Sequence, residues 1–234
     1  MAAMDSFSPE QLLLLPLWYV SFLLAVTCHE AAHAWVAHLG GDSTAYQGGQ
    51  VSLNPLPHMQ REPFGTILVP VISFVLMGWT IGWASAPYDP HWEIRYPRRA
   101  ALMALAGPLA NLLLAAIFFT LLKVGLSAGW WIDVPALRAY DQLVVVPDGG
   151  ASWLPGLSRF ASISLLLNSV LFIFNLLPVP PLDGSSVLAG ISRLGRQLRE
   201  LLQTSFSFFG LIIAWVVFPY LFQPFFALVI SWLY

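Results

Sequence analysis

The sequence predicts an all-α polytopic membrane protein with about four full transmembrane helices, one re-entrant or partial segment, and a small β-hairpin after the first helix. Of its 234 residues, 58% are hydrophobic and only 9% are charged, whereas soluble domains carry about 25% charged residues. Five long stretches contain no Asp, Glu, Lys or Arg, namely residues 11–28, 64–88, 100–122, 160–182 and 201–234. A bilayer crossing needs about 20 apolar residues, so each stretch can cross a membrane or nearly so.

This composition also excludes two other classes of protein. Disordered chains combine low hydrophobicity with high net charge, and nucleic-acid-binding domains carry a basic surface, but this chain is apolar with a formal net charge of -2. We therefore expect no nucleic-acid partner. The first stretch is not expected to be a secretory signal, which needs a basic start, because the first Lys or Arg is Arg61. We expect one membrane domain over residues 1–234, with its core at 12–188 and C-terminal membrane segments at 201–234.

The hairpin is expected directly after the first helix. Gly and Asp residues at 40–42 end the helical pattern, and the sequence Gln-Gly-Gly-Gln at 47–50 separates the short segments 43–46 and 51–53. Two short segments joined by glycines are typical of a β-hairpin.

Two apolar stretches are interrupted by helix-breaking residues. Residues 64–88 are interrupted by Pro70, Gly78, Gly82 and Pro87, which favours a re-entrant segment, because irregular backbone is tolerated at membrane depth where protein surrounds it. The final stretch, 201–234, is long for one span. Pro219 and Pro224 within it predict one crossing followed by a shorter membrane segment.

Residues 29–33, within the first predicted helix, are His-Glu-Ala-Ala-His. Positions four apart on an α-helix differ by about 40° in direction, so His29 and His33 project from one face and can bind one metal ion. Glu30 lies close enough to act as the base of a metallohydrolase. Ionisable groups at membrane depth cost at least about 2.5 kcal/mol and usually mark function.

A catalytic zinc site has three protein ligands, so two histidines leave one ligand to be found. Asp183 is the best candidate, because prolines at 178, 180 and 181 keep the chain before it extended and Gly184 follows it as a flexible residue. The alternative is that Asp183 and Gly184 form only a turn where the chain leaves the membrane.

Three motifs in this order, His-Glu-Ala-Ala-His at 29–33, Ala-Gly-Pro-Leu-Ala-Asn at 106–111 and the segment from Asn175 to Asp183-Gly184, resemble the site-2 protease family of intramembrane zinc metalloproteases. The resemblance covers residues 12–188 and is closest to compact bacterial-type members without PDZ or CBS domains. It implies that His29, His33 and Asp183 bind one zinc ion per chain and that Glu30 is the general base. It also implies regulated cleavage of transmembrane protein substrates in the lipid bilayer. One departure is Ser185, where members usually carry a second glycine.

Asn111 and Asn175 are further candidates, for binding the substrate or a reaction intermediate. Asn111 lies four residues after Gly107 on one helical face, where small residues also serve helix packing; the resemblance favours a role in the site. Asn175 precedes the prolines and can instead satisfy backbone groups that they free. His58 and His91 are expected to be surface histidines.

A shared metal ion constrains the topology. His29, His33 and Asp183 lie near the C-terminal ends of their stretches, so these stretches must be parallel, which requires an odd number of crossings between them. Two stretches intervene, so one does not cross, and 64–88 is the candidate. This arrangement places seven of the ten Lys and Arg on one side, against six for four simple crossings. The positive-inside rule then predicts an outside N-terminus and a site nearer the cytoplasmic face of a bacterial cell membrane.

The expected function is therefore that of an intramembrane zinc endopeptidase, and two alternatives remain open. A membrane metal transporter or metal-binding protein would need a polar path through both leaflets, whereas the polar residues here cluster at one depth. An inactive, substrate-binding scaffold is the other alternative, against which the intact metal and base residues argue.

Overall fold

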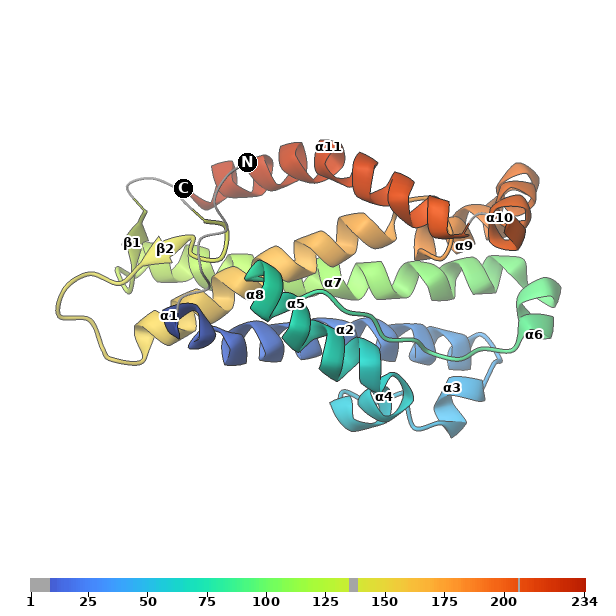
Figure 1. Ribbon diagram of the computed structural model, residues 1–234, viewed down its shortest axis with the longest axis horizontal. Helices are drawn as coiled ribbons and strands as arrows, with labels where there is room; N and C mark the ends of the chain where they lie inside the picture. Colours follow the sequence, from blue (N-terminus) through green and yellow to red (C-terminus); the bar gives the residue numbers. More distant parts are fainter. Residues whose placement is uncertain (1–8, 135–138, 206) are drawn as a thin grey trace.

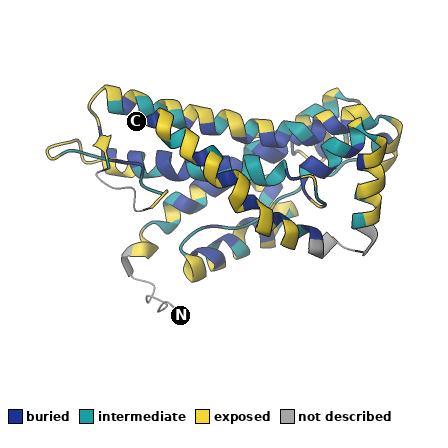
Figure 2. Cartoon of the chain, turned by 90° about the horizontal axis from the view of Figure 1, so that it is seen from above, coloured by how far each residue is buried: buried dark blue, intermediate teal, exposed yellow. Residues whose placement is uncertain are grey.

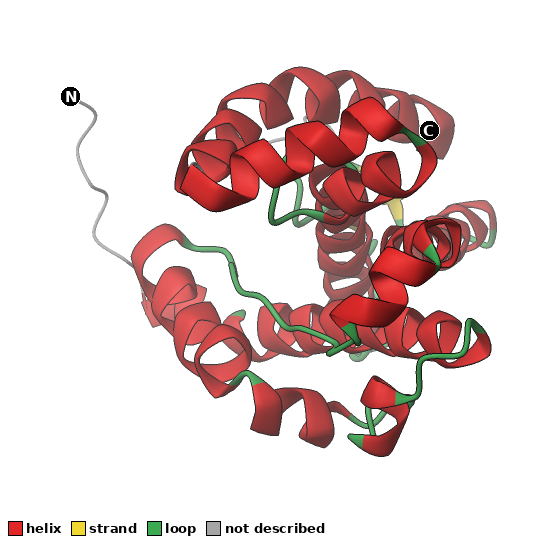
Figure 3. Cartoon of the chain, turned by 90° about the vertical axis from the view of Figure 1, so that its right-hand side faces the viewer, coloured by secondary structure: helices red, strands yellow, loops and turns green. Residues whose placement is uncertain are grey.

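The computed structural model describes residues 9–134, 139–205 and 207–234 and confirms the all-α fold class. In chain order its helices are α1 (Pro9–Leu12), α2 (Leu15–Leu39), α3 (Thr44–Gln47), α4 (Pro55–Arg61), the π-helical turn η1 (Phe64–Leu68), α5 (Val69–Met77), α6 (Pro90–Arg95), α7 (Pro97–Ser127), α8 (Leu154–Asn175), α9 (Asp183–Ile191), α10 (Arg193–Ser205) and α11 (Ser207–Leu233). The described strands are β1 (Ile132–Asp133) and β2 (Val144–Val145). Figure 3, which views the molecule from the end that carries α6 and α10, shows this predominance of helix.

Among the described residues, four helices are long and apolar enough to cross a membrane: α2, α7, α8 and the Gly210–Leu233 part of α11. Their directions can be followed by colour in Figure 1: α2 and α8 run the same way, and α7 and α11 run the opposite way. The parallel arrangement predicted for the first and fourth apolar stretches is therefore present.

Helix α7 lies at the centre and packs against α2, α8 and α9. Its inward face carries small residues, among them Ala104 and Gly107, which let the neighbouring helices approach closely. Large apolar side chains such as Leu76, Leu113 and Val216 are exposed. Figure 2 shows exposed and buried positions alternating along the helices. This distribution fits a surface that contacts lipid.

The stretch 64–88 forms a short helix and an extended return. Its helical part, Phe64–Met77, is shorter than the four candidate spans, and it ends at Gly78, which has a φ of 78°. The returning chain contacts the helix through hydrogen bonds from the Trp83 N–H to the Gly65 carbonyl (3.1 Å) and from the Ile81 N–H to Ser73 Oγ (2.8 Å). This is the geometry of the predicted re-entrant segment.

The β-hairpin predicted at 43–53 is wrong, because the chain there begins with the helical turn α3. The Asp42 carboxylate accepts hydrogen bonds from the Thr44 N–H and hydroxyl, a side-chain contact that competes with strand pairing. The small antiparallel pair lies between α7 and α8 instead, with Ile132 opposite Val145.

The two membrane segments predicted at 201–234 are also corrected. Residues 201–205 end α10, and α11 is one helix that contains both Pro219 and Pro224. Prolines are tolerated in transmembrane helices where neighbouring groups or local adjustments compensate for the lost hydrogen bond. At the end of α11, Lys123 Nζ of α7 donates to the carbonyls of Trp232 (2.9 Å) and Leu233 (2.8 Å).

Asp42 links the end of α2 to the end of the re-entrant return. Its buried carboxylate accepts from the Thr44 N–H (2.9 Å), the Thr44 hydroxyl (2.6 Å) and the Asp89 N–H (2.7 Å). Burial raises the pKa of this carboxyl, but the three hydrogen bonds outweigh it and lower the pKa below its ordinary value. The stabilisation is therefore present above the unfolded pKa of about 3.9 and is lost as the pH falls through the native pKa.

We expect Asp42→Asn to lower the stability of the detergent-purified protein near neutral pH by about 1–3 kcal/mol, because hydrogen bonds to the charged carboxylate are lost. The difference from wild type should begin to shrink below about pH 4, where the carboxyl of the unfolded chain takes up a proton, and should vanish only at a lower pH, once the native carboxyl is also protonated. Thermal unfolding measured across this pH range tests both statements. Asp148→Asn, at an exposed loop position, is the control and should change neither. A difference that stays constant with pH would contradict this role for the Asp42 charge.

Candidate metal centre

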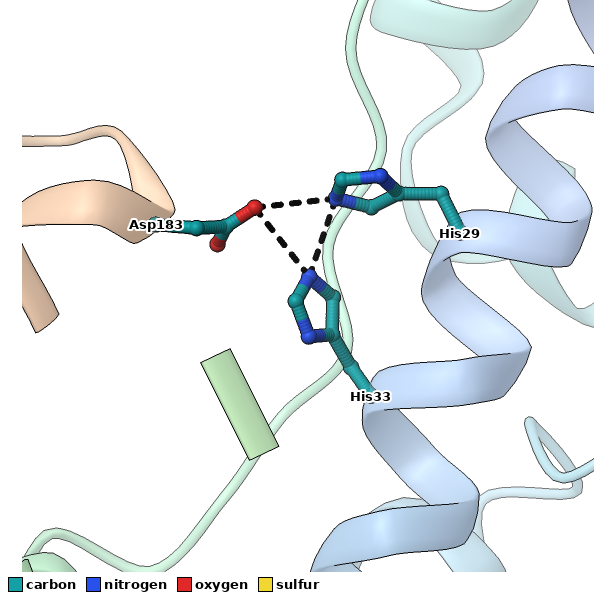
Figure 4. A group of neighbouring side chains, drawn as sticks. All are labelled: His29, His33 and Asp183. Carbon is teal, nitrogen blue, oxygen red and sulfur yellow. Dashed lines mark hydrogen bonds and ion pairs between the residues drawn. The ribbon is translucent and has the colours of Figure 1, made fainter. Parts of the chain in front are cut away.

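His29 and His33 lie one turn apart on α2, and their rings meet at the Nε2 atoms, which are 2.9 Å apart. The rings stand nearly perpendicular to each other, at 82°, and both residues are buried. Figure 4 shows the two rings projecting from the same face of the helix. The spacing in the sequence predicted this shared direction.

Asp183 reaches the same point from the start of α9. Its Oδ2 atom lies 3.1 Å from His29 Nε2 and 3.4 Å from His33 Nε2, as drawn in Figure 4. The parallel course of α2 and α8 brings the two parts of the chain to one depth, because α9 follows closely after α8. The structure thus brings together all three residues predicted as metal ligands.

Both imidazole rings contact helix α7 through their Nδ1 atoms. His33 Nδ1 lies 2.7 Å from the Met103 carbonyl, and His29 Nδ1 lies 2.6 Å from Asn111 Oδ1. Because a carbonyl oxygen can only accept, Nδ1 of His33 carries the proton of the neutral ring and Nε2 keeps its lone pair. Met103 was not among the residues predicted for the site, because a backbone carbonyl leaves no signal in the sequence.

These residues fit a metal ion. Two imidazole nitrogens and one carboxylate oxygen converge, all within 4.8 Å of one another, and Asp183 Oδ2 is buried without a hydrogen-bond donor. Converging lone pairs repel one another unless a cation lies between them, and two neutral histidines with one carboxylate form a ligand set that zinc accepts in catalytic sites. A cation held by these three atoms would account for the unpartnered oxygen.

The backbone around Asp183 differs from the expectation. Leu182 is extended (φ −74°, ψ 153°), as the prolines predict, but Asp183 is already the first residue of α9. Gly184 is needed for space, not for flexibility: a Cβ there would lie 2.2 Å from the Leu176 carbonyl oxygen. Ser185 stabilises the turn, because its N–H and its hydroxyl both donate to the Leu182 carbonyl. A second glycine is therefore not required at 185.

Glu30 lines a cavity of about 320 Å³ together with His33 and Asp183. The re-entrant return lines this cavity at residues 84–86 and 88, and Arg199 of α10 lines it as well. Polar groups and two of the three candidate ligands therefore share one space that can hold water.

Arg199 forms an ion pair with Glu93 and donates a hydrogen bond to the Tyr88 hydroxyl (3.3 Å). Burial, together with the Glu93 carboxylate, raises the pKa of Tyr88 above its ordinary value. The phenol therefore stays neutral at physiological pH and serves as a hydrogen-bonding group.

The remaining candidates lie as follows. Asn175 ends α8, and its amide donates to the Leu171 carbonyl of its own helix (3.1 Å); a role in binding substrate or intermediate stays a prediction. His91 is exposed, as expected, but His58 is buried, and its Nε2 bonds to the Ser52 carbonyl (3.0 Å). The surface position expected for His58 is wrong, because α4 folds back against α2.

Gly107 of α7 faces the metal centre, whereas its spacing in the sequence predicted only a contact between packed helices. A Cβ at this residue would lie 2.3 Å from His33 Nε2 and 2.5 Å from His29 Nε2. Both atoms are candidate ligands, so the absence of a side chain at Gly107 leaves room for the rings. Its place in the Ala-Gly-Pro motif was the available signal.

Gly107→Ala is expected to weaken metal binding about 10- to 100-fold or more, because the new methyl group displaces both imidazole rings. This range is the one seen when a residue that supports a metal ligand is lost. Gly156→Ala is the matched control, since a Cβ there meets nothing within 4 Å. Chelator competition on the two purified variants measures the affinity. Wild-type affinity in Gly107→Ala would show that the rings do not bind at the positions described.

Comparison with known proteins identifies a family and two similar chains. The family model described as Peptidase family M50 matches residues 18–217. Over 214 residues the chain is 36% identical to “Putative zinc metalloprotease YwhC” of Bacillus subtilis, a match that covers 91% of this chain and 86% of that protein. It is 29% identical to “Putative zinc metalloprotease Rip2” of Mycolicibacterium smegmatis, over 71% of this chain and 54% of that protein. No solved structure matches the chain.

Proposed function

Because the chain belongs to peptidase family M50, the site-2 protease family, we propose that it is a zinc endopeptidase that cleaves membrane-protein substrates in or near their transmembrane segments. Residues 1–234 form one intramembrane metalloprotease domain in this proposal, because α7 contacts the helices that carry both parts of the metal centre. Regulated proteolysis of a membrane substrate is the physiological role that we assign to it.

The observation that carries the proposal is the placement of Glu30 beside the metal centre. Three converging lone pairs alone are compatible with metal storage or transport, but neither function needs a further carboxylate. Glu30 lines the same cavity as His33 and Asp183, which is the position required of a base that acts on a water at the metal centre.

In the proposed mechanism, His29, His33 and Asp183 would hold a zinc ion, and Met103 and Asn111 orient the two rings. A bound zinc ion supplies Lewis acidity, which lowers the pKa of a water toward about 7 and polarises the scissile carbonyl. Glu30 accepts the proton of the attacking water and donates it to the leaving amine.

A transmembrane helix must unwind before cleavage, because its carbonyls are engaged in its own hydrogen bonds. The strand edge expected at 43–53 is not present, but the re-entrant return is extended and lines the cavity at residues 84–86. Within the described chain, the backbone groups of Ala84 and Ala86 have no hydrogen-bond partner. We therefore assign substrate alignment by β-strand addition to this segment.

We place the N-terminus outside a bacterial cell membrane and the metal centre nearer its cytoplasmic face. The arginines of α6, of the first turn of α7 and of α10 lie at one end of the helices, whereas Lys123 of α7 and Arg159 of α8 lie toward the other end. The positive-inside rule supports this orientation. Arg138, which also entered the charge count, lies outside the described residues.

The proposal is tested by comparing membranes that contain the wild-type chain with membranes that contain Glu30→Gln. A fragment of a membrane protein that appears only with the wild type supports proteolysis. If the protein fragments are the same in both membranes, the proposal fails.

A further inference from the structure

A chain of buried amide side chains connects α8 to the metal centre through α7. Asn168 Oδ1 lies 2.9 Å from Asn111 Nδ2, and Asn111 Oδ1 lies 2.6 Å from His29 Nδ1. Both asparagines are completely buried. Asn168 was not predicted to have any role, because nothing in the sequence marks one polar residue of an apolar helix as facing the site.

Backbone carbonyls determine the orientation of both amides. Asn168 Nδ2 donates to the Ser164 carbonyl (2.8 Å), so its Oδ1 faces Asn111. Asn111 Nδ2 donates to that oxygen and to the Ala25 carbonyl of α2 (3.1 Å), so its own Oδ1 faces His29. Since carbonyl oxygens only accept, each amide has one possible assignment. His29 Nδ1 must then carry the proton, and its Nε2 lone pair points at Asp183.

We propose that Asn111 and Asn168 are positioning residues that hold His29 in the tautomer and direction needed to bind zinc. This inference rests on the proposed function and deepens it. It replaces the substrate contact predicted for Asn111, because the two N–H groups and the oxygen of that amide are already engaged and no donor remains for an intermediate.

The effect of Asn168 is to hold the Asn111 amide in this single orientation. Without the Asn168 acceptor, one N–H of Asn111 is buried and unpaired, and only the Ala25 carbonyl holds the amide. A rotated amide presents its N–H₂ group to His29 Nδ1, which moves the ring proton to Nε2. A proton at Nε2 removes the lone pair that zinc needs.

A contact between α2 and α8 provides a control. Ser21 Oγ of α2 and Ser164 Oγ of α8 are 2.9 Å apart and buried. Ser164→Ala removes this bond between α2 and α8, but it leaves the Ser164 backbone carbonyl that anchors Asn168. A purely structural role of polar groups between these helices would make Ser164→Ala and the asparagine variants behave alike.

The experiment measures zinc affinity by chelator competition on the detergent-purified full chain, and the visible spectrum of the cobalt-substituted protein. Asn111→Leu should weaken zinc binding about 10- to 100-fold, and Asn168→Leu about tenfold, with altered cobalt spectra. Asn168→Asp should restore affinity, because a neutral carboxylic acid can both accept from Asn111 and donate to Ser164. Ser164→Ala should keep wild-type affinity and spectrum while lowering the melting temperature.

The inference is overturned if both leucine variants bind zinc like wild type with an unchanged spectrum, or if Ser164→Ala weakens zinc binding equally. Asn168→Ser, which shortens the side chain without adding bulk, replaces Asn168→Leu if the latter does not fold. Failure of the proposed function has a different signature: wild type then binds zinc without cleaving any membrane protein, while the differences between variants persist.

Discussion

Glu30→Gln is expected to abolish proteolysis while leaving zinc binding intact. The substitution keeps the size of the side chain but removes its ability to take a proton from water, a step that contributes about 10²- to 10⁴-fold to rate in general acid–base catalysis. Glu30 is not among the atoms that converge on the metal centre, so the number of zinc ions per chain should stay at the wild-type value.

Two further variants make this comparison specific. His29→Ala should lose both zinc and proteolysis, because it removes a ligand. Asp148→Asn changes a carboxylate in an exposed loop and should retain both. Zinc content is measured on purified protein, and cleavage is measured in membranes as the fragment that the wild type produces.

The possible results separate the alternative functions. Proteolysis by Glu30→Gln at the wild-type rate would remove Glu30 from the role of base. Zinc bound by a wild-type chain that cleaves nothing would favour the inactive scaffold or a metal-binding protein. Zinc flux through vesicles that contain the purified chain would favour the transporter.

The parts of the site that the sequence predicted are those determined by short-range geometry. His29 and His33 share a face because any helix places positions four apart together. The parallel arrangement of α2 and α8 followed from requiring Asp183 to reach the same metal ion. The scarcity of charge identified the membrane, and the interruptions in 64–88 identified the segment that does not cross.

The parts that were missed depend on contacts between distant segments. Gly107 faces the two rings only because α7 packs against α2 at this depth, and Asn168 reaches the site only through Asn111. The hairpin expected at 43–53 failed partly for the same reason: besides the local contact of Asp42 with Thr44, the Gln50 side chain donates to the Ser85 carbonyl and the Asp89 N–H donates to Asp42. Side chains in this segment bind the re-entrant return, whereas the glycine pattern reports only the local turn preference.

Asp183→Ala is expected to weaken zinc binding by about two orders of magnitude or more. This effect exceeds the 10- to 100-fold range that is typical when a residue supporting a ligand is lost. The substitution removes one of three converging ligand atoms and leaves the two Nε2 atoms, 2.9 Å apart, to hold the ion alone. Proteolysis should fall with zinc occupancy, because the nucleophile and the polarised carbonyl both depend on the ion.

Asp141→Ala is the matched control for this variant. The Asp141 side chain is 16% exposed, close to the 21% of Asp183, and its carboxylate likewise lies close to side-chain nitrogen, with Arg159 Nη2 at 2.8 Å. A general loss of stability on removing a partly buried carboxylate would lower zinc binding in both variants, whereas the loss of a metal ligand would lower it only in Asp183→Ala. Zinc content and chelator competition distinguish the two causes. Unchanged zinc binding in Asp183→Ala would remove Asp183 from the ligand set, and its position would then be explained by the turn that leads into α9.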